Sequence, residues 1–310
     1  MSVFLSTLNQ TAFLFSFIVL GFLFAKYKVI PENSATVIAK LENTLFVPAL
    51  VFNTFIKNFT VKQFESAWKI LVVSLAMIIV IMPIAVLISK CVTRDKYEQN
   101  IYTYGLAFSN FGFMGNAVVS ALFPDIFLEY IIFTLPLWTM IYLWGVPVLL
   151  IADCDGKQTL GKRLKAFANP MFFAMIAGSI IGLSGIKLPS WVESVVSVSG
   201  DCMSPMAMLL TGITVSAISM KKTFTDIKIY VVSVIRLVVI PLVFLWLSRY
   251  LHLNHTMFIC ALCSLAMPLG LNTIVIPNAY GKDTSVGAGM AIISHLLSCI
   301  TIPLIFALIL

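Results

Sequence analysis

The chain has 310 residues, of which 60% are hydrophobic and 11% are charged, and its mean hydropathy is +1.02. Soluble domains carry about 25% charged residues, so this composition excludes a soluble globular protein. The net charge of +7 lies mostly in short loops between apolar stretches, so it indicates membrane orientation, and nucleic acid is not an expected partner. A bilayer-spanning helix needs about 20 apolar residues, and residues 3–25 and 70–89 contain no charged residue.

The hydropathy pattern predicts an all-α polytopic membrane protein with ten spans. The spans cover residues 4–25, 34–56, 68–90, 98–122, 126–151, 166–185, 190–219, 228–249, 256–280 and 283–309. Cytoplasmic loops are enriched in Lys and Arg, and alternate loops here carry 13 and 5 of these residues. The richer set includes the first loop, so both termini are expected outside.

The two halves of the chain match each other at an offset of 156 to 158 residues. The matched residues are Gly21 with Gly178, Pro31 with Pro189, Pro48 with Pro205, Pro83 with Pro241, Gly112 with Gly270 and Pro147 with Pro303. Each half holds five spans, and an odd number inverts the second copy. Residues 1–154 and 166–310 are therefore expected to be two inverted five-helix repeats, an arrangement characteristic of secondary transporters.

Both halves interrupt their fourth span with helix-breaking residues. Span 4 contains FSNFGFMGNAVV (108–119), and its partner in span 9 is LAMPLGLNTIVIPN (265–278). Gly and Pro interrupt helices, and broken backbone at bilayer depth is tolerated where it is buried in protein or lines a cavity. We expect spans 4 and 9 to unwind near residues 110–116 and 268–273, to cross there and to form a binding site.

The crossing predicts an anion site, because the second half of each broken helix directs a partly positive N-terminus with free N–H groups at the midplane. Asn side chains add amide donors. The expected substrate-binding residues are Ser109, Asn110, Gly112, Asn116, Pro268, Asn272 and Thr273 in the two broken spans, with Asn43 and Ser204 beside the prolines of spans 2 and 7. The alternative is that these residues only allow close helix packing.

Ionisable residues inside the predicted spans are candidates for function, because charge is costly in a bilayer. Arg236 in span 8 either supplies positive charge near the crossing, for the anion or in place of a bound cation, or pairs structurally with an acid such as Asp201 in span 7. His295 in span 10 either couples protons to transport or is a structural histidine. Asp201 and Glu42, in span 2, are further candidates for coupling.

No cofactor or metal is expected. Cys260 and Cys263 form a CxxC inside span 9, but no other Cys or His pair is near them in the sequence, so they are interpreted as packing residues. The sequence also lacks the P-loop, HExxH and GxSxG motifs. Neither an enzyme nor a primary pump is therefore expected.

The same motifs resemble a known family. SNFGFMGNAVV is similar to the span-4 signature of the auxin efflux carrier family, AMPLGLNTIVIPNAYGKD to its span-9 motif and FVPALVF to its span-2 proline motif. The resemblance covers the whole chain, and the lack of a long hydrophilic central loop points to the bacterial branch. One departure is Asn116, where many relatives have Pro, so either the crossing is looser there or Asn116 faces the substrate.

The resemblance implies a scaffold of spans 1, 2, 6 and 7 and a transport domain of spans 3–5 and 8–10 that moves like an elevator. It also implies the bacterial cytoplasmic membrane and small organic anions such as malate or malonate. We therefore expect a secondary active transporter of a small carboxylate, embedded in the bilayer. A homodimer is possible, and the sequence does not decide the oligomeric state. The alternatives are an anion channel and a membrane anion sensor, neither of which carries out alternating access.

Overall fold

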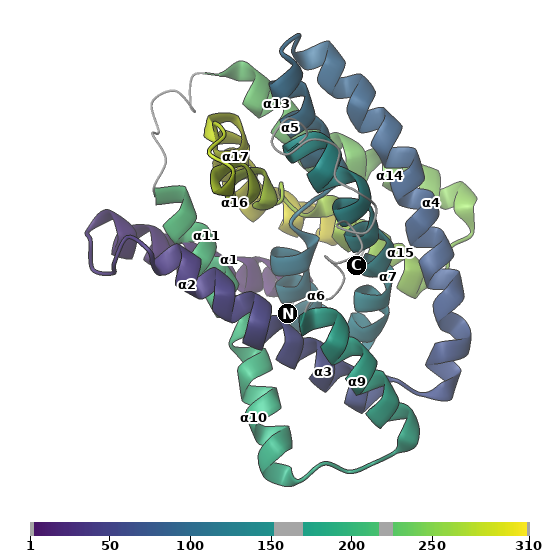
Figure 1. Cartoon of the computed structure of the whole chain (residues 1–310). Helices are drawn as coiled ribbons and strands as arrows, with labels where there is room; N and C mark the ends of the chain where they lie inside the picture. The colour runs from purple at the N-terminus through teal and green to yellow at the C-terminus, as the bar shows by residue number, and fades with distance from the viewer. Residues whose placement is uncertain (1–2, 152–169, 217–225, 309–310) are drawn as a thin grey trace.

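The computed structural model describes residues 3–151, 170–216 and 226–308, whose backbone is helical apart from short connections (Figure 1). In chain order the helices are α1 (Val3–Lys26), α2 (Ser34–Leu41), η1 (Glu42–Phe46), α3 (Val47–Asn58), α4 (Val61–Val92), α5 (Lys96–Ala107), η2 (Phe111–Gly115), α6 (Asn116–Leu122), η3 (Pro124–Ile126), α7 (Phe127–Met140), η4 (Ile141–Leu150), α9 (Pro170–Ser184), α10 (Ser190–Asp201), α11 (Met203–Ser216), α13 (Ile227–Val234), η5 (Ile235–Val239), α14 (Ile240–Leu251), α15 (His255–Ala266), α16 (Asn272–Ala279) and α17 (Ser285–Ala307). Elements η1, η2, η4 and η5 are π-helical, and η3 is a 3-10 turn.

Among the described residues, six helical runs are long and apolar enough to cross a bilayer. They are Ser34–Asn58, Ala67–Val92, Pro124–Leu150, Ser190–Ser216, Ile227–Leu251 and Ser285–Ala307, and the shorter apolar helices are Ala12–Lys26, Phe111–Leu122, Pro170–Ser184 and His255–Ala266. Helices satisfy their own backbone polar groups, which lipid cannot do. The prediction of a polytopic all-helical membrane protein is confirmed. The basic residues Lys157, Lys162, Arg163, Lys165, Lys221 and Lys222, used to predict orientation, lie outside the described residues.

Figure 1 shows two groups of helices. One group holds α1, α2, α3, α9, α10 and α11 and lies in the lower and left part of the view. The other holds α4, α5, α7 and α13 to α17, with α4, α14 and α15 at the right and α16 and α17 at the upper left. In the first group α1 packs on α11, and α3 packs on α9 and α10. In the second group α4 packs on α5 and α7, and α13 packs on α17. Contacts of α1 with α17 and of α11 with η2 join the groups.

Glycines set the closest helix contacts in the first group. A Cβ added to Gly21 of α1 would overlap the carbonyl oxygen of Leu209 in α11, and one added to Gly212 of α11 would overlap that of Ile18 in α1. Gly178 of α9 likewise lies against α3. Small residues allow such close packing in a bilayer. Gly21 and Gly178 are matched in the sequence repeat, and each contacts the other half of the chain.

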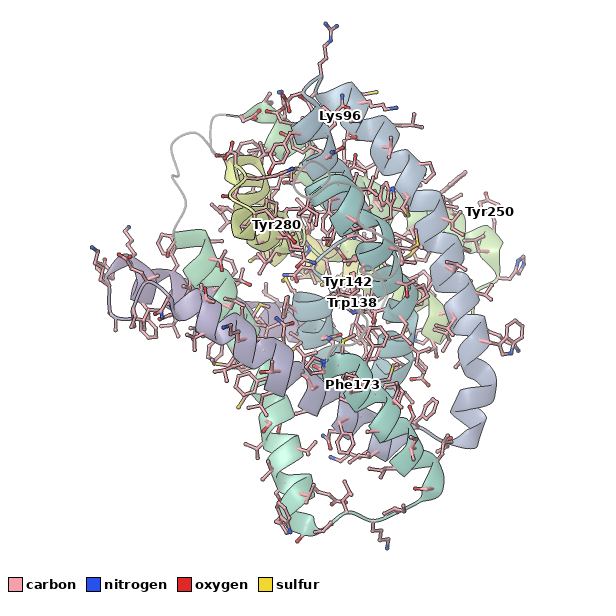
Figure 2. The ribbon with its side chains drawn as sticks, viewed as in Figure 1. Lys96, Trp138, Tyr142, Phe173, Tyr250 and Tyr280 are labelled. Atoms are coloured by element: carbon pink, nitrogen blue, oxygen red, sulfur yellow. The ribbon has the colours of Figure 1, made fainter. Side chains whose placement is uncertain are left out.

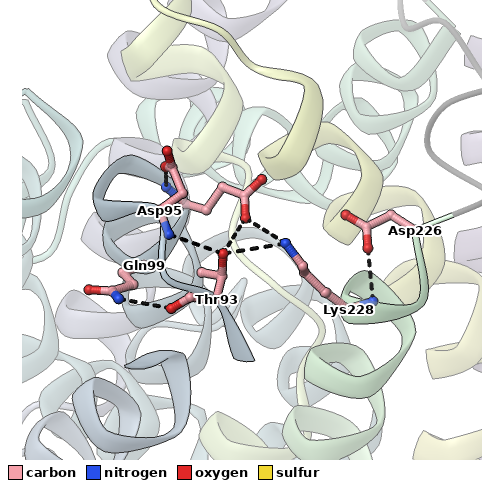
Figure 3. Close-up of polar contacts among 6 residues, drawn as sticks. Thr93, Asp95, Gln99, Asp226 and Lys228 are labelled. Carbon is pink, nitrogen blue, oxygen red and sulfur yellow. Dashed lines mark hydrogen bonds and ion pairs between the residues drawn. The ribbon is translucent and has the colours of Figure 1, made fainter. Parts of the chain in front are cut away.

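Three connections lie together at one end of the second group. The Lys228 ammonium, at the start of α13, donates to Glu98 Oε2 at 3.0 Å and to Thr93 Oγ1 at 3.3 Å (Figure 3). The hydroxyl of Tyr97 donates to the carbonyl of Asp283, just before α17, at 2.6 Å. The connections that precede α5, α13 and α17 are therefore on one side of the molecule. All three belong to the loop set that is richer in Lys and Arg.

Candidate substrate-binding site

Two interrupted helices meet in the second helix group. Residues 108–110 separate α5 from η2, and residues 267–271 separate α15 from α16. The backbone N–H of Asn110 donates to the carbonyl of Pro268 at 2.7 Å. This bond satisfies backbone groups that the interrupted helices leave without helical partners, as burial at membrane depth requires. The two breaks therefore contact each other directly.

Further bonds hold the crossing together. Ser109 and Leu269 form a short antiparallel bridge. The Ser109 hydroxyl donates to the carbonyl of Ser264 at 2.6 Å, and the Leu269 N–H donates to Ser294 Oγ of α17 at 3.1 Å. The predicted residue Ser109 therefore fixes the crossing with its side chain, while Ser294, which the sequence did not single out, ties it to α17.

The breaks are shorter than predicted and begin earlier in the chain. Of the residues predicted to be unwound, Gly112 lies in η2, Asn116 begins α6, and Asn272 and Thr273 form the first turn of α16. The prediction that these positions are non-helical is wrong. The helix resumes as soon as the backbone has passed the crossing, because only there does the partner break replace the helical hydrogen bonds.

A small cavity of about 20 Å³ lies beside the crossing, with room for about one water molecule. It is lined by Tyr104, Ser109, Asn110, Phe111, Gly112, Phe113, Trp138, Ile141, Gly270, Leu271 and Asn272. The predicted site residues Ser109, Asn110, Gly112 and Asn272 are thus brought together. They come from both broken helices, as the repeat predicted.

Helix N-termini provide the electrostatic character of this cavity. The helical run Phe111–Leu122 and helix α16 both begin at residues that line it. The first N–H groups of a helix have no helical partners and carry a partial positive charge. Two such ends at one cavity favour an anionic ligand.

Aromatic side chains close the cavity. Trp138 stacks on Tyr142 with ring centroids 5.9 Å apart (Figure 2) and meets the ring of Phe111 edge-on at 5.2 Å. Tyr104 accepts a 2.9 Å hydrogen bond from the Asn272 amide. Neither Tyr104 nor Trp138 was predicted to belong to the site, because nothing in their local sequence distinguishes them from ordinary apolar helix residues.

Arg236 donates hydrogen bonds to carbonyls at the ends of α5 and α15, the first halves of the two broken helices. It is 1% exposed, and its guanidinium donates to the carbonyls of Leu106 at 2.7 Å, Ser264 at 2.9 Å and Met267 at 3.5 Å. These carbonyls lie at the C-terminal ends of α5 and α15, where the helix dipole is negative. Arg236 is not among the residues that line the cavity.

The alternative that Arg236 pairs with Asp201 is wrong. Asp201 is exposed at the end of α10, in the other helix group, and the two residues form no ion pair in the described part of the chain. Backbone carbonyls, and not a carboxylate, accept the hydrogen bonds of the Arg236 guanidinium. The sequence pattern could not show that these carbonyls lie near the arginine.

The remaining predicted polar residues lie away from the cavity lining. Thr273 is buried with its hydroxyl on the Gly270 carbonyl, and Asn116 is buried in α6. Asn43 is exposed and donates its amide to the Ala39 carbonyl of its own helix. Ser204 is half-buried, and its hydroxyl lies 3.8 Å from a methionine sulfur, that of Met203. A role for these four in binding stays a prediction.

Two buried ionisable side chains differ in how they are satisfied. His295 of α17 is 2% exposed, with Nδ1 2.7 Å from the Ala291 carbonyl and Nε2 3.1 Å from the amide nitrogen of Asn110. Glu42 of η1 is fully buried, and neither carboxyl oxygen has a hydrogen-bond partner among the described residues. His295 is therefore connected to the cavity through Asn110, whereas Glu42 lies in the first helix group.

Comparison with known proteins identifies the family. A model of the membrane transport protein family matches residues 6–162 and 160–306, which is nearly the whole chain. The chain belongs to this family, that of the auxin efflux carriers. The resemblance found in the sequence motifs is therefore confirmed, and the family is one of membrane transport proteins.

The chain is also similar to individual proteins, at low identity. The uncharacterized transporter YfdV of Escherichia coli K12 is 24% identical over 155 residues, which are 49% of this chain and 48% of the relative. The YfdV proteins of Escherichia coli O157:H7 and Shigella flexneri give the same values. The chain thus spans about half the length of the curated relatives it matches.

Proposed function

We propose that the protein is a secondary active transporter that moves a small organic anion, a carboxylate, by elevator-type alternating access. The observation that carries the choice of an anion is the polarity of the crossing. Two helix N-termini begin at the cavity, while Arg236 lies at the C-terminal ends of the other two half-helices. The partly positive helix N-termini are available to bind an anionic ligand, whereas the partly negative C-terminal ends already bind the guanidinium of Arg236.

This arrangement makes a bound metal cation unnecessary for the crossing. Carbonyls at the ends of broken helices are the groups that coordinate sodium in many transporters. Here the guanidinium of Arg236 occupies the carbonyls of Leu106, Ser264 and Met267. Of the two functional roles predicted for Arg236, replacement of a bound cation is therefore the one that we propose.

The packing of the two helix groups supports inverted repeats. Span 1 (α1) packs on span 7 (α11), and span 6 (α9) packs on span 2 (α3), which are equivalent contacts if residues 1–154 and 166–310 are related by a two-fold axis. We propose the first helix group as the scaffold. The cavity lining comes from the second group together with η2 and η4, and from none of the helices of the first group, so the site can move as part of one transport domain.

The proposed setting is the bacterial cytoplasmic membrane with ten spans and both termini outside. The 13 to 5 distribution of basic residues supports this orientation. The contact of Glu98 with Lys228 and that of Tyr97 with Asp283 support it as well, because they bring connections of the basic-rich set together.

Counterflow in proteoliposomes tests the function. Vesicles loaded with unlabelled malonate or malate should accumulate the labelled anion against its gradient, because a carrier exchanges one substrate for another. A channel would show flux without counterflow, and a sensor would bind the anion without moving it. Absence of counterflow with a panel of small mono- and dicarboxylates would contradict the proposal.

A further inference from the structure

His295 and Asn110 form a hydrogen-bonded pair whose polarity can be assigned from chemistry. The carbonyl of Ala291 can only accept a hydrogen bond, so Nδ1 of His295, 2.7 Å away, carries a hydrogen. In a neutral imidazole the other nitrogen, Nε2, is then an acceptor. The amide nitrogen of Asn110 lies 3.1 Å from it and donates to it. One amide hydrogen of Asn110 is therefore held by His295.

Protonation of His295 would reverse this hydrogen bond. Both nitrogens of an imidazolium are donors, so Nε2–H needs an acceptor and cannot receive the Asn110 amide hydrogen. A turn of the Asn110 amide by half a revolution brings its oxygen to Nε2. Both amide hydrogens then become free for the cavity that Asn110 lines. When His295 is protonated, the Asn110 amide thus offers two hydrogens to an anion. When His295 is neutral, the amide offers at most one.

Among the described residues, no acid lies near His295 at its depth to balance a positive charge on its ring. In the described part of the chain, α17 packs against α1, α5, α11, α13, α15, α16 and η5. The titratable side chains on these elements and on α17 are Lys26, Lys96, Tyr97, Glu98, Tyr102, Tyr104, Lys228, Tyr230, Arg236, His255, Cys260, Cys263 and Cys299. Glu98 is paired with Lys228 at the start of α5, and the buried charged residue among them is Arg236, which is positive.

We propose that His295 is the proton-coupling site of the transporter and that Asn110 transmits its protonation to the substrate anion. A proton on His295 is unfavourable while the cavity is empty, because the ring is buried and no residue that the structure describes supplies a negative charge beside it. A carboxylate in the cavity supplies that charge, and the turned Asn110 amide binds the carboxylate. Proton and anion therefore bind together, and the protein is a proton–anion symporter. This inference rests on the proposed transport function.

Binding linked to uptake of one proton should weaken by up to about tenfold per pH unit as the pH rises. Malonate binding to purified wild-type protein should show this trend between about pH 5.5 and 8, with uptake of about one proton per anion in weakly buffered solution. His295→Gln should lose the proton uptake, because glutamine keeps hydrogen-bonding groups but does not titrate. His255→Gln, at an exposed position, is the matched control and should behave like the wild type.

The outcomes separate the inference from the function on which it rests. Binding without proton uptake, or uptake that persists in His295→Gln, would overturn the coupling and leave the transporter standing. No binding or counterflow with any small carboxylate at any pH would overturn both. If His295→Gln does not fold, labelled histidine in the wild type decides the question by NMR. Of the three histidines, only His295 should gain its proton when malonate is added.

Discussion

The backbone N–H of Asn110 donates a 2.7 Å hydrogen bond to the carbonyl of Pro268, and these two residues are 158 positions apart, within the offset of the internal repeat. Residues that are equivalent in two repeats can touch each other only where the axis relating the repeats passes. If the proposed inverted repeats are correct, the crossing of the broken helices marks their axis. The cavity that we propose as the substrate site lies beside the crossing, which is the position expected in inverted-repeat transporters.

Asn272→Ala should reduce transport by about tenfold or more, since a hydrogen bond to a charged ligand contributes about 1.5–3 kcal/mol. Its amide lines the cavity and contacts Tyr104. Uptake into proteoliposomes at matched protein content measures the effect. Asn43→Ala is the control, because that amide is exposed and bonds within its own helix. Equal losses in both variants would mean that the site extends into the scaffold.

Arg236→Ala should destabilise the fold by about 3 kcal/mol or more, because several buried carbonyls lose a charged donor. Thermal unfolding in detergent measures the change. Arg236→Lys should recover part of the stability, since it keeps the charge but not the planar fork. Asp201→Asn should not rescue Arg236→Ala, and Arg249→Ala, at an exposed arginine, should leave the melting temperature unchanged. Rescue by Asp201→Asn would restore the ion-pair alternative.

Gly112→Ala should impair transport, because its new Cβ would lie 2.6 Å from Cζ2 of Trp138 at the cavity wall. Trp138→Phe removes that atom and makes room for the methyl group. The double variant should therefore be more active than Gly112→Ala alone, with a coupling energy of about 1 kcal/mol in a double-mutant cycle. Additive losses would show that Trp138 does not limit the space beside residue 112.

Cysteines placed at Lys96 and Lys187 should react with impermeant reagents from opposite sides of the membrane. Both positions are exposed, and they lie in loops predicted to be cytoplasmic and external, respectively. A background without the six native cysteines is needed. Labelling of intact cells should modify residue 187 and spare residue 96 until the membrane is permeabilised. Modification of both from outside would contradict the inverted repeat.

The sequence by itself determined the helical membrane class, the family and the existence of two breaks. Apolar stretches of about 20 residues allow little but helices in lipid, and the clusters around Asn110 and Pro268 contain the residue types that interrupt helices. It located the breaks to within a few residues. The sequence did not predict the exact limits of the two breaks, because Gly112 and Asn272 are helical once the backbone has left the crossing.

Tertiary structure alone decided which groups meet. The carbonyls that bind Arg236 come from α5 and α15, 130 and 28 to 31 residues away in the chain, and every residue has a carbonyl, so no sequence pattern could mark these three. The same holds for Trp138, which became a wall of the cavity, and for the bond between Asn110 and His295, which are 185 residues apart. Local composition fixes where a helix can break, but only packing between distant helices fixes what the broken ends contact.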